Sequence, residues 1–209
     1  TPQPAVGEVR IEVHAASLNF PDLLTVQNMY QIKPPLPFVP GSEFSGTVEA
    51  LGEDVSHLRV GERVASIGVA GGFATHACVA AAQVLPLPPG FDLADAAAFA
   101  FTYGTSHHAL IDRAGLRAGE TVLVLGAAGG VGSAAVQIAK AAGARVVAAA
   151  SSPEKCQFCR QLGADVTINT SLDNLRDAAK AATDGRGPDV VYDPVGGDLA
   201  ELAFRSIAW

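Results

Sequence analysis

The stretch VLVLGAAGGVGSAAVQIA, residues 122–139, sets three glycines between an apolar run and a helix-like run. Gly126, Gly129 and Gly132 have the spacing G-x-x-G-x-x-G, which is related to the G-x-G-x-x-G of dinucleotide-binding turns. Such a turn allows close approach of the backbone to a pyrophosphate, and the free N–H groups that begin the next helix bind the phosphates. A structural tight turn is the alternative. We predict dinucleotide contacts from seven consecutive residues: Gly126, Ala127, Ala128, Gly129, Gly130, Val131 and Gly132.

The chain after residue 120 alternates between apolar runs and helical runs. We predict strands over 121–126, 144–150, 165–169 and 188–194, with helices over 131–143, 152–163 and 173–185 between them. All-apolar strands separated by helices are typical of a parallel sheet that is covered on both faces. The pattern therefore predicts an α/β fold with a Rossmann-like, doubly wound parallel sheet.

The end of the second predicted strand bears on the choice of cofactor. NAD sites usually place an acidic residue there, whereas this chain has Ser151, Ser152 and, one helical turn later, Lys155. Small hydroxyls and a cation suit a 2′-phosphate, so we predict NADP (NADPH) rather than NAD. The alternative is that Ser152 caps the helix, with Pro153 in its first turn, and that Lys155 is a solvated surface residue.

A second cofactor contact is predicted after the fourth strand, in VVYDPVGGD, residues 190–198. Ligands of open α/β sheets bind at the carboxyl ends of the strands, so Asp193 and Val195, in the segment from Asp193 through Gly197, are candidate cofactor contacts. The alternative is an ordinary turn, because Asp, Pro and Gly favour turns by themselves.

The first half of the chain has a different pattern, with short β-rich runs between Gly and Pro residues. The runs cover 8–15, 46–52, 62–68 and 73–79, and their spacing predicts a small, partly open antiparallel barrel. Asp92 can cap a helix over 93–100, and a second helix over 102–115 is expected to end at Gly115. We predict three regions: a barrel at 1–90, a helical connection at 91–118 and the dinucleotide-binding domain at 119–209.

Composition excludes several classes of partner. The net charge of −7 argues against nucleic acid or an anionic membrane, and no apolar run approaches the ~18 residues of a membrane span. The three cysteines do not form a disulfide framework, which favours a reducing, cytoplasmic location. Organellar import stays open as an alternative, because the N-terminus looks incomplete.

The motifs LNFPD (18–22), VPGSEFSG (39–46), YGTSHHAL (103–110), GAAGGVG (126–132) and VVYDPVGG (190–197) together resemble the medium-chain dehydrogenase/reductase superfamily. Within it, the chain is similar to the zinc-independent NADPH:quinone oxidoreductases. The resemblance implies a GroES-like substrate domain, a Rossmann domain, an active site in the cleft between them and a homodimer in the full-length form. It also implies that a strand precedes residue 1 and that a long segment follows residue 209, so we expect an incomplete, C-terminally truncated sheet.

Metal chemistry is not expected. Zinc-dependent relatives carry Gly-His-Glu where this chain has Gly41, Ser42 and Glu43, and Asn19 and Phe20 stand where a cysteine ligand is expected. A catalytic zinc needs about three protein ligands. Glu43 is instead interpreted as a structural ion pair or backbone anchor, with a role in the reaction as the alternative.

The resemblance implies hydride transfer from NADPH to a quinone or an α,β-unsaturated carbonyl. It places Asn19 near the nicotinamide and substrate, Thr105 over the nicotinamide face and Tyr30 as a donor or acid. The structural alternatives are a turn before Pro21 for Asn19, packing on the proline cluster for Tyr30 and back-bonding within a helix for Thr105. Two other functions stay open: an enoyl-thioester (enoyl-CoA) reductase, and a non-catalytic NADPH-binding protein or inactive fragment.

Two pairs of neighbouring residues, one of histidines and one of cysteines, could be interpreted as catalytic. His107 and His108 are adjacent on a helix and point about 100° apart, so they cannot form one site. Cys156 and Cys159 lie a turn inside a predicted helix with no second pair nearby, so we predict that they pack in the core.

Overall fold

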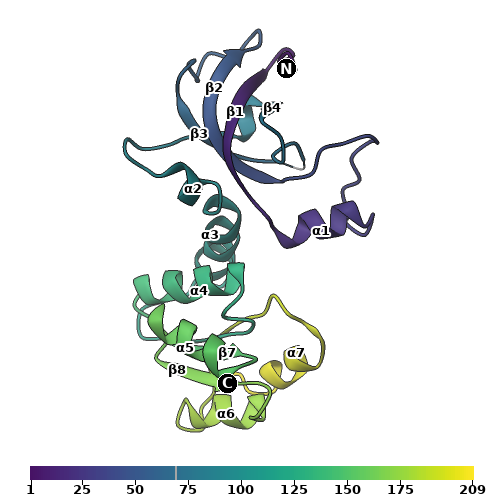
Figure 1. The fold of residues 1–209 in the computed structure, drawn as a ribbon. Coiled ribbons are helices and arrows are strands. Elements are labelled where there is room, and N and C mark those ends of the chain that lie inside the picture. The colour runs from purple at the N-terminus through teal and green to yellow at the C-terminus, as the bar shows by residue number, and fades with distance from the viewer. Residues whose placement is uncertain (69) are drawn as a thin grey trace. The chain divides into compact units, whose positions relative to one another are not determined.

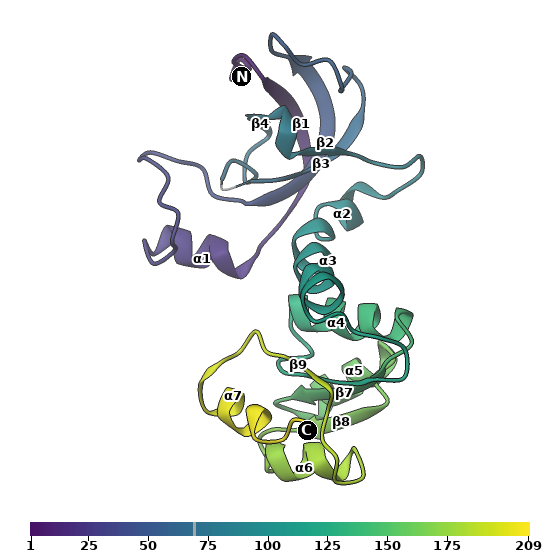
Figure 2. The same ribbon diagram turned by 180° about the vertical axis from the view of Figure 1, so that it is seen from behind.

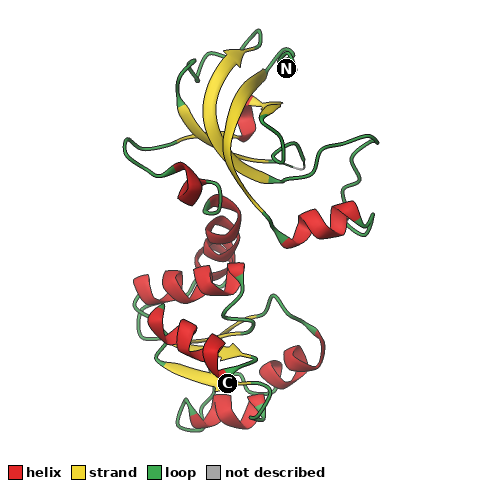
Figure 3. Ribbon diagram, in the orientation of Figure 1, coloured by secondary structure: helices red, strands yellow, loops and turns green. Residues whose placement is uncertain are grey.

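The computed structural model describes residues 1–68 and 70–209, and the chain divides into two compact units. The first unit is Thr1–Phe101 and the second is Thr102–Trp209. Figure 1 follows the chain through both, and Figure 3 shows a sheet in each. The boundary lies inside the segment that the sequence assigns to a helical connection, and the predicted limits at residues 90 and 118 stay predictions.

The first unit is built on one antiparallel sheet with the strand order β4-β1-β2-β3-β5. Four strands were predicted, and a fifth, short strand was not. β2 begins at Glu43, three residues before the predicted run over 46–52, because its pairing with β1 and β3 extends to Ser17 and Ile67. The strands are β1 (Glu8–Ser17), β2 (Glu43–Leu51), β3 (Arg63–Ile67), β4 (His76–Ala80) and β5 (Val84–Pro86).

Apolar side chains on one face of this sheet make the core of the first unit. Phe44 and Ile11 are its largest fully buried side chains, and Leu58 from a loop closes the cluster. The period-two alternation of the strands explains this, because residues i and i+2 share a face. The opposite face of the sheet carries polar groups, some of which belong to the candidate site described below.

Helices of the first unit lie around the sheet. They are α1 (Phe20–Val26), the 3₁₀ turn η1 (Ala81–Gln83) and α2 (Leu93–Ala96). Asp92 caps α2 as predicted, since its Oδ1 accepts from the N–H groups of Ala94 at 2.7 Å and Asp95 at 3.1 Å. The helix ends four residues earlier than predicted.

The predicted helix over 102–115 is present in two pieces. It consists of α3 (Ala100–His107) and the π-helical turn η2 (His108–Arg113). Gly115 follows with a φ of +61°, the left-handed conformation that commonly ends helices. His108 lies on the surface, where its Nδ1 is 3.0 Å from Oδ2 of Asp112.

The second unit is a doubly wound parallel sheet, which confirms the predicted fold class. Its strand order is β8-β7-β6-β9. The strands are β6 (Thr121–Val124), β7 (Arg145–Ala150), β8 (Val166–Asn169) and β9 (Val190–Tyr192); the helices are α4 (Gly130–Ala141), α5 (Pro153–Gln161), α6 (Leu175–Ala181) and α7 (Gly197–Phe204).

Helices cover both faces of this sheet. One core cluster joins the sheet to α4, α5 and η2, and the other joins the opposite face to α6 and α7. Figure 2 shows the same layers from behind, with β9 beside the other strands. The chain runs outward from β6 to β8 and then returns to β9 on the other side of β6, so a crevice is expected where β6 and β9 end.

Cys156 and Cys159 pack in the first of these clusters, as predicted. Both side chains are buried, and Cys156 Sγ lies 3.6 Å from the carbonyl oxygen of Ile168. Burial raises the pKa of the Cys159 thiol, which is the opposite of what a reactive thiolate needs. Among the helices that the structure describes, none has both the length and the apolar character to cross a membrane.

Candidate functional site

The glycine turn joins β6 to α4 and depends on the absence of side chains. Gly126 has a φ of +56°, and a Cβ there would lie 2.8 Å from Cγ2 of Val195. A Cβ on Gly132 would lie 2.2 Å from the carbonyl oxygen of Gly126, a distance that no real contact allows. The first and last glycines of the motif therefore let the turn form and let α4 pack against it.

The middle of the turn is open to solvent. Gly129 is the N-cap of α4 and is exposed, as is Gly130. The first N–H groups of a helix have no partner within the helix, and its dipole favours an anion there. The start of α4 is thus suited to a phosphate group.

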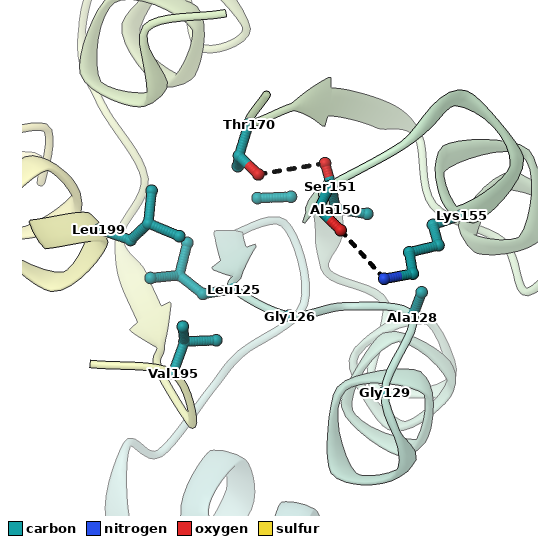
Figure 4. A pocket seen from close by; sticks show the side chains of 11 residues that line it. Leu125, Gly126, Ala128, Gly129, Ala150, Ser151, Lys155, Thr170, Val195 and Leu199 are labelled. Atoms are coloured by element: carbon teal, nitrogen blue, oxygen red, sulfur yellow. Dashed lines mark hydrogen bonds between the residues drawn. The ribbon is translucent and has the colours of Figure 1, made fainter. Parts of the chain in front are cut away.

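A cavity of about 320 Å³ extends from this turn to the end of β7. Figure 4 shows its lining, with Lys155 directed toward Ser151 on one side and Val195 and Leu199 on another. It lies at the carboxyl ends of the strands, where open α/β sheets bind ligands. The lining residues are Leu125, Gly126, Ala128, Gly129, Ala149, Ala150, Ser151, Lys155, Thr170, Val195 and Leu199.

Six of the predicted cofactor residues line this cavity: Gly126, Ala128, Gly129, Ser151, Lys155 and Val195. The other six do not belong to its lining: Ala127, Gly130, Val131, Gly132, Ser152 and Asp193. Ala127 is buried, and its N–H donates to the carbonyl oxygen of Ala149 at 3.0 Å. The carbonyl oxygen of Val131 accepts from Ser106 Oγ at 2.7 Å. These two therefore hold the turn in place, and their contact with a cofactor stays a prediction.

Five lining residues were not predicted: Leu125, Ala149, Ala150, Thr170 and Leu199. Thr170 could have been found, since it directly follows a predicted strand at the same sheet edge. Its Oγ1 donates to the carbonyl oxygen of Ala150 at 3.3 Å. Leu199 could not, because it comes from α7, which reaches the cavity through the tertiary fold.

The polar residues at the end of β7 show features of both interpretations of the sequence, the polar pair at the cavity and the helix cap. Lys155 Nζ donates to Ser151 Oγ at 3.0 Å, and both side chains line the cavity. Ser152 caps α5, since its Oγ accepts from the N–H of Lys155 at 3.3 Å. Ser152 therefore caps the helix, while the side chains of Ser151 and Lys155 face the cavity.

Asp193 closes the turn after β9. Its Oδ1 accepts from the N–H groups of Val195 and Gly196, both at 2.8 Å, which is the structural alternative for an Asp in this turn. Thr105 is exposed and lines a separate cavity of about 360 Å³ together with Tyr192, Asp193 and Pro194. The second unit thus brings Thr105 and Asp193 to one surface hollow.

In the first unit, Glu43 is fully buried and accepts three hydrogen bonds. They come from Ser17 Oγ at 2.6 Å, Asn19 Nδ2 at 3.0 Å and the backbone N–H of Phe101 at 2.7 Å. All three donors are uncharged, and one belongs to the backbone. Of the two structural roles predicted for Glu43, the backbone anchor is therefore the one found.

Asn19 is the N-cap of α1 and is half-buried. Its N–H donates to Asp22 Oδ2 at 2.8 Å, and Asp22 Oδ1 accepts from the N–H of Ser42 at 2.9 Å. Tyr30 follows α1, where its N–H donates to the carbonyl oxygen of Leu24 at 3.2 Å. Hydrogen bonds within the first unit therefore fix the backbone at Asn19 and at Tyr30.

The donor set of the first unit does not fit zinc. Ser42, Glu43 and Asn19 offer neither a thiolate nor an imidazole, which are the usual zinc ligands with carboxylate as a lesser partner. Over residues 1–68 and 70–209, no group of three or more His, Cys, Asp or Glu side chains could hold a metal ion.

Comparison with known proteins assigns both units. Residues 5–89 match the alcohol dehydrogenase GroES-like domain, and residues 130–208 match the family described as zinc-binding dehydrogenase. The chain is 43% identical to the mouse quinone oxidoreductase-like protein 2 over 205 residues, which is 97% of this chain and 58% of the mouse protein.

Solved structures agree. The Escherichia coli quinone oxidoreductase complexed with NADPH is 32% identical with a TM-score of 0.94, over 99% of this chain and 64% of that one. An NAD-dependent alcohol dehydrogenase is 31% identical with a TM-score of 0.92, over 99% of this chain and 68% of that one.

The fold and the turn define a GroES-like unit followed by a Rossmann-like unit. The chain belongs to the medium-chain dehydrogenase/reductase superfamily, and it is similar to quinone oxidoreductases within it. It spans just over half the length of the curated relative from mouse.

Proposed function

We propose that the chain binds NADPH at the glycine turn and belongs to a reductase of quinones or α,β-unsaturated carbonyls. The observation that carries this proposal is the cavity that joins Gly126 and Gly129 to Ser151 and Lys155. The E. coli relative, whose structure holds NADPH, supports the same choice of cofactor.

The residues present fit such a cofactor. The side-chain-free surface of Gly129 and the start of α4 would hold the pyrophosphate, and Ser151 and Lys155 would hold a 2′-phosphate. Apolar side chains of Leu125, Val195 and Leu199 would enclose the remaining, less polar surface. Thr170 adds a hydroxyl at the edge of the same cavity.

When bound, NADPH supplies the hydride, and the protein orients it and stabilises charge on the acceptor. We assign Asn19 and Thr105 to orientation of the reacting groups. The phenol of Tyr30 donates a hydrogen bond to the oxygen on which negative charge develops. No zinc takes part in this scheme, and the oxygen is stabilised by hydrogen bonds alone.

A calorimetric titration of the 209-residue chain with NADPH and, separately, with NADH tests the cofactor site. We expect NADPH to bind at least about tenfold more tightly, since Lys155 and Ser151 add charge-assisted hydrogen bonds to the extra phosphate. Equal affinities would contradict the choice of cofactor, and binding of neither would contradict the site.

The acceptor is tested by following NADPH oxidation with a quinone, an enone and an enoyl thioester. Faster turnover of the quinone or enone supports the proposal, whereas preference for the thioester supports the enoyl reductase. A protein that binds NADPH and oxidises it with none of these is the non-catalytic binder. Turnover that falls after treatment with a metal chelator would contradict the zinc-independent scheme.

The remaining proposals concern the setting of the protein. We propose a homodimer in the full-length form, a cytoplasmic location and no nucleic-acid or membrane partner. The net charge of −7 supports the last of these, because nucleic acids and anionic membranes attract basic surfaces.

A further inference from the structure

Ser106 is a fully buried serine of α3 whose hydroxyl bonds to a different helix. Its Oγ donates to the carbonyl oxygen of Val131, in the first turn of α4, at 2.7 Å. A serine inside a helix more often bonds to a carbonyl of its own helix or points to solvent. The carbonyl oxygen of Val131 can accept this bond in addition to the one within α4, because it has two lone pairs. The hydroxyl of Ser106 therefore ties the beginning of α4 to α3.

Tyr192, at the end of β9, fixes the direction of this hydroxyl. Its phenol oxygen lies 3.0 Å from Ser106 Oγ, and the single hydroxyl proton of Ser106 is already donated to Val131. The phenol of Tyr192 must therefore donate to Ser106. The backbone of Tyr192 is held as well, since its carbonyl oxygen accepts from the N–H of Leu125 at 2.9 Å. Tyr192 thus bonds to the residue before the first glycine of the turn and, through Ser106, to the residue before the last.

A second contact between α3 and the start of α4 is apolar. A Cβ on Gly130 would lie 3.2 Å from Cγ2 of Thr102, which stands four residues before Ser106. Residues four apart share one face of a helix, so Thr102 and Ser106 together form the surface on which α4 begins. The N–H groups at this point are among those that have no partner within the helix.

We propose that Ser106, oriented by Tyr192, is a positioning residue that holds the N–H groups at the start of α4 in the place where the pyrophosphate of the cofactor binds. The proposal rests on the proposed function, in which NADPH binds at the glycine turn. Donors that are already in place cost less to order when an anion binds. Because Ser106 is fully buried, it acts through α4 and not by contact with the cofactor.

The first test compares two ligands, NADPH and adenosine 2′-monophosphate, by calorimetric titration. Adenosine 2′-monophosphate carries the phosphate that we assign to Ser151 and Lys155, but it has no pyrophosphate. We expect Ser106→Ala to weaken binding of NADPH by about tenfold and to leave binding of adenosine 2′-monophosphate unchanged. Lys155→Ala should weaken binding of both ligands, which shows that the smaller one occupies the same cavity.

The part of Tyr192 is tested with Tyr192→Phe, which removes only the phenol hydroxyl. We expect a smaller loss of NADPH affinity, about threefold, because Ser106 keeps its own bond to Val131. Adding Tyr192→Phe to Ser106→Ala should cause no further loss, since Tyr192 acts through Ser106. A further loss in the double variant would contradict that order.

Ser206→Ala is the matched control. Ser206 follows α7, is also fully buried and donates its Oγ proton to the carbonyl oxygen of Ala203 at 2.7 Å. The substitution therefore removes one buried hydroxyl and one hydrogen bond from the same unit, away from α4. We expect Ser206→Ala to keep the full affinity for NADPH, whereas a loss caused by lower stability alone would appear in both variants.

Hydrogen exchange of the chain without ligand tests the positioning directly. The N–H of Ser133 closes the first turn of α4 by donating to the carbonyl oxygen of Gly129 at 2.8 Å. We expect Ser106→Ala to speed exchange of this amide by about tenfold. The amide of Ala142, which donates to Ile138 at the other end of α4 at 2.9 Å, should exchange as in the wild type.

Three results would overturn the positioning role of Ser106. They are a Ser106→Ala variant that binds NADPH as tightly as the wild type, one that loses both ligands alike, and one in which exchange at Ser133 is unchanged. A wild type that binds neither ligand would instead contradict the proposed function. The exchange measurement would then still decide whether Ser106 holds the start of α4.

Discussion

Lys155 brings a positive charge to the cavity at the end of β7, within 3.0 Å of Ser151 Oγ. The position of Lys155 follows from helix geometry. Ser152 is the N-cap of α5, and Lys155, three residues later, lies one helical turn on and on the same side of the helix. Under the proposed function, Lys155 and Ser151 would distinguish NADPH from NADH, whereas the glycine turn would bind the part that the two cofactors share.

We expect Lys155→Ala to weaken binding of NADPH by about tenfold, as lost charge-assisted hydrogen bonds imply, and to leave binding of NADH unchanged. Calorimetric titration with both cofactors measures this. Lys140→Ala is the control of equal charge, because Lys140 pairs with Asp165 at 2.9 Å and does not line the cavity. Equal losses for NADPH and NADH would contradict the role of Lys155.

Glu43 shows the limit of prediction for single residues. Its carboxylate was correctly expected to need partners, because a buried, unpaired charge is costly. Which partners it has could not be derived, since Ser17 and Phe101 lie 26 and 58 residues away in the chain. Only the pairing of β1 with β2 and the return of α3 bring them together.

At the scale of elements, the glycine turn between β6 and α4 is tightly constrained. Its first glycine has a positive φ, and its last leaves no room for a Cβ against the backbone of the first. At the exposed middle glycines the constraint is milder, because a Cβ would lie 3.3 Å from Gly126 O at Gly129 and 3.2 Å from Thr102 Cγ2 at Gly130.

Gly132→Ala should destabilise the chain by about 1–3 kcal/mol, the usual cost of overpacking, because its Cβ would meet the carbonyl oxygen of Gly126 at 2.2 Å. Denaturant unfolding measures the change. Gly104→Ala, in α3 where a Cβ meets nothing within 4 Å, should instead stabilise by up to about 1 kcal/mol. A neutral Gly132→Ala would show that the turn can shift.

Gly129→Glu and Gly130→Glu should each abolish binding of NADPH, because a carboxylate would stand where the pyrophosphate meets the start of α4. Both positions are exposed, so we expect the unfolding midpoint to change little. Fluorescence titration with NADPH gives the affinity, and circular dichroism checks the fold. Affinity retained in either variant would place the phosphates elsewhere.

At the scale of the whole molecule, two aspartates secure the amino edge of the second unit's sheet. Asp189 Oδ2 accepts from the N–H of Thr121 at 2.8 Å, and Asp165 Oδ2 accepts from the N–H of Val146 at 2.7 Å. The hydrogen bond from Arg186 lowers the pKa of Asp189, and burial, which would raise this pKa, has a smaller effect. Burial alone would raise the pKa of Asp165, but bonds from Lys140 and Val146 and the charge of Lys140 outweigh it and lower that pKa.

A carboxylate whose pKa is lowered on folding stabilises the fold above its unfolded pKa and loses that contribution as the pH falls through the folded value. We therefore expect the free energy of unfolding to decline as the pH falls below 3.8, the ordinary pKa of aspartate. Asp189→Asn should make this decline less steep. Urea unfolding at a series of pH values measures it. Asp184→Asn, at an exposed turn with a φ of 53°, is the matched control, and an unchanged slope in Asp189→Asn would contradict the assignment.

The family and the fold class could be predicted because they depend on local patterns. The glycine spacing, the apolar strands and the helix caps at Asp92 and Ser152 each act over a few residues. The missed features that local patterns could not supply are the short strand β5, the division of the helix over 102–115 into α3 and η2, and the wall that Leu199 adds to the cavity.

The sequence by itself determined a parallel, doubly wound sheet with a dinucleotide turn, preceded by a β-rich unit, because backbone conformation and hydrophobic period are properties of neighbouring residues. The tertiary structure alone decided that the ends of β6, β7, β8 and β9 enclose one cavity, and that Glu43 accepts from Ser17, Asn19 and the backbone of Phe101. Both follow from long-range strand pairing, which brings together groups that no local pattern connects.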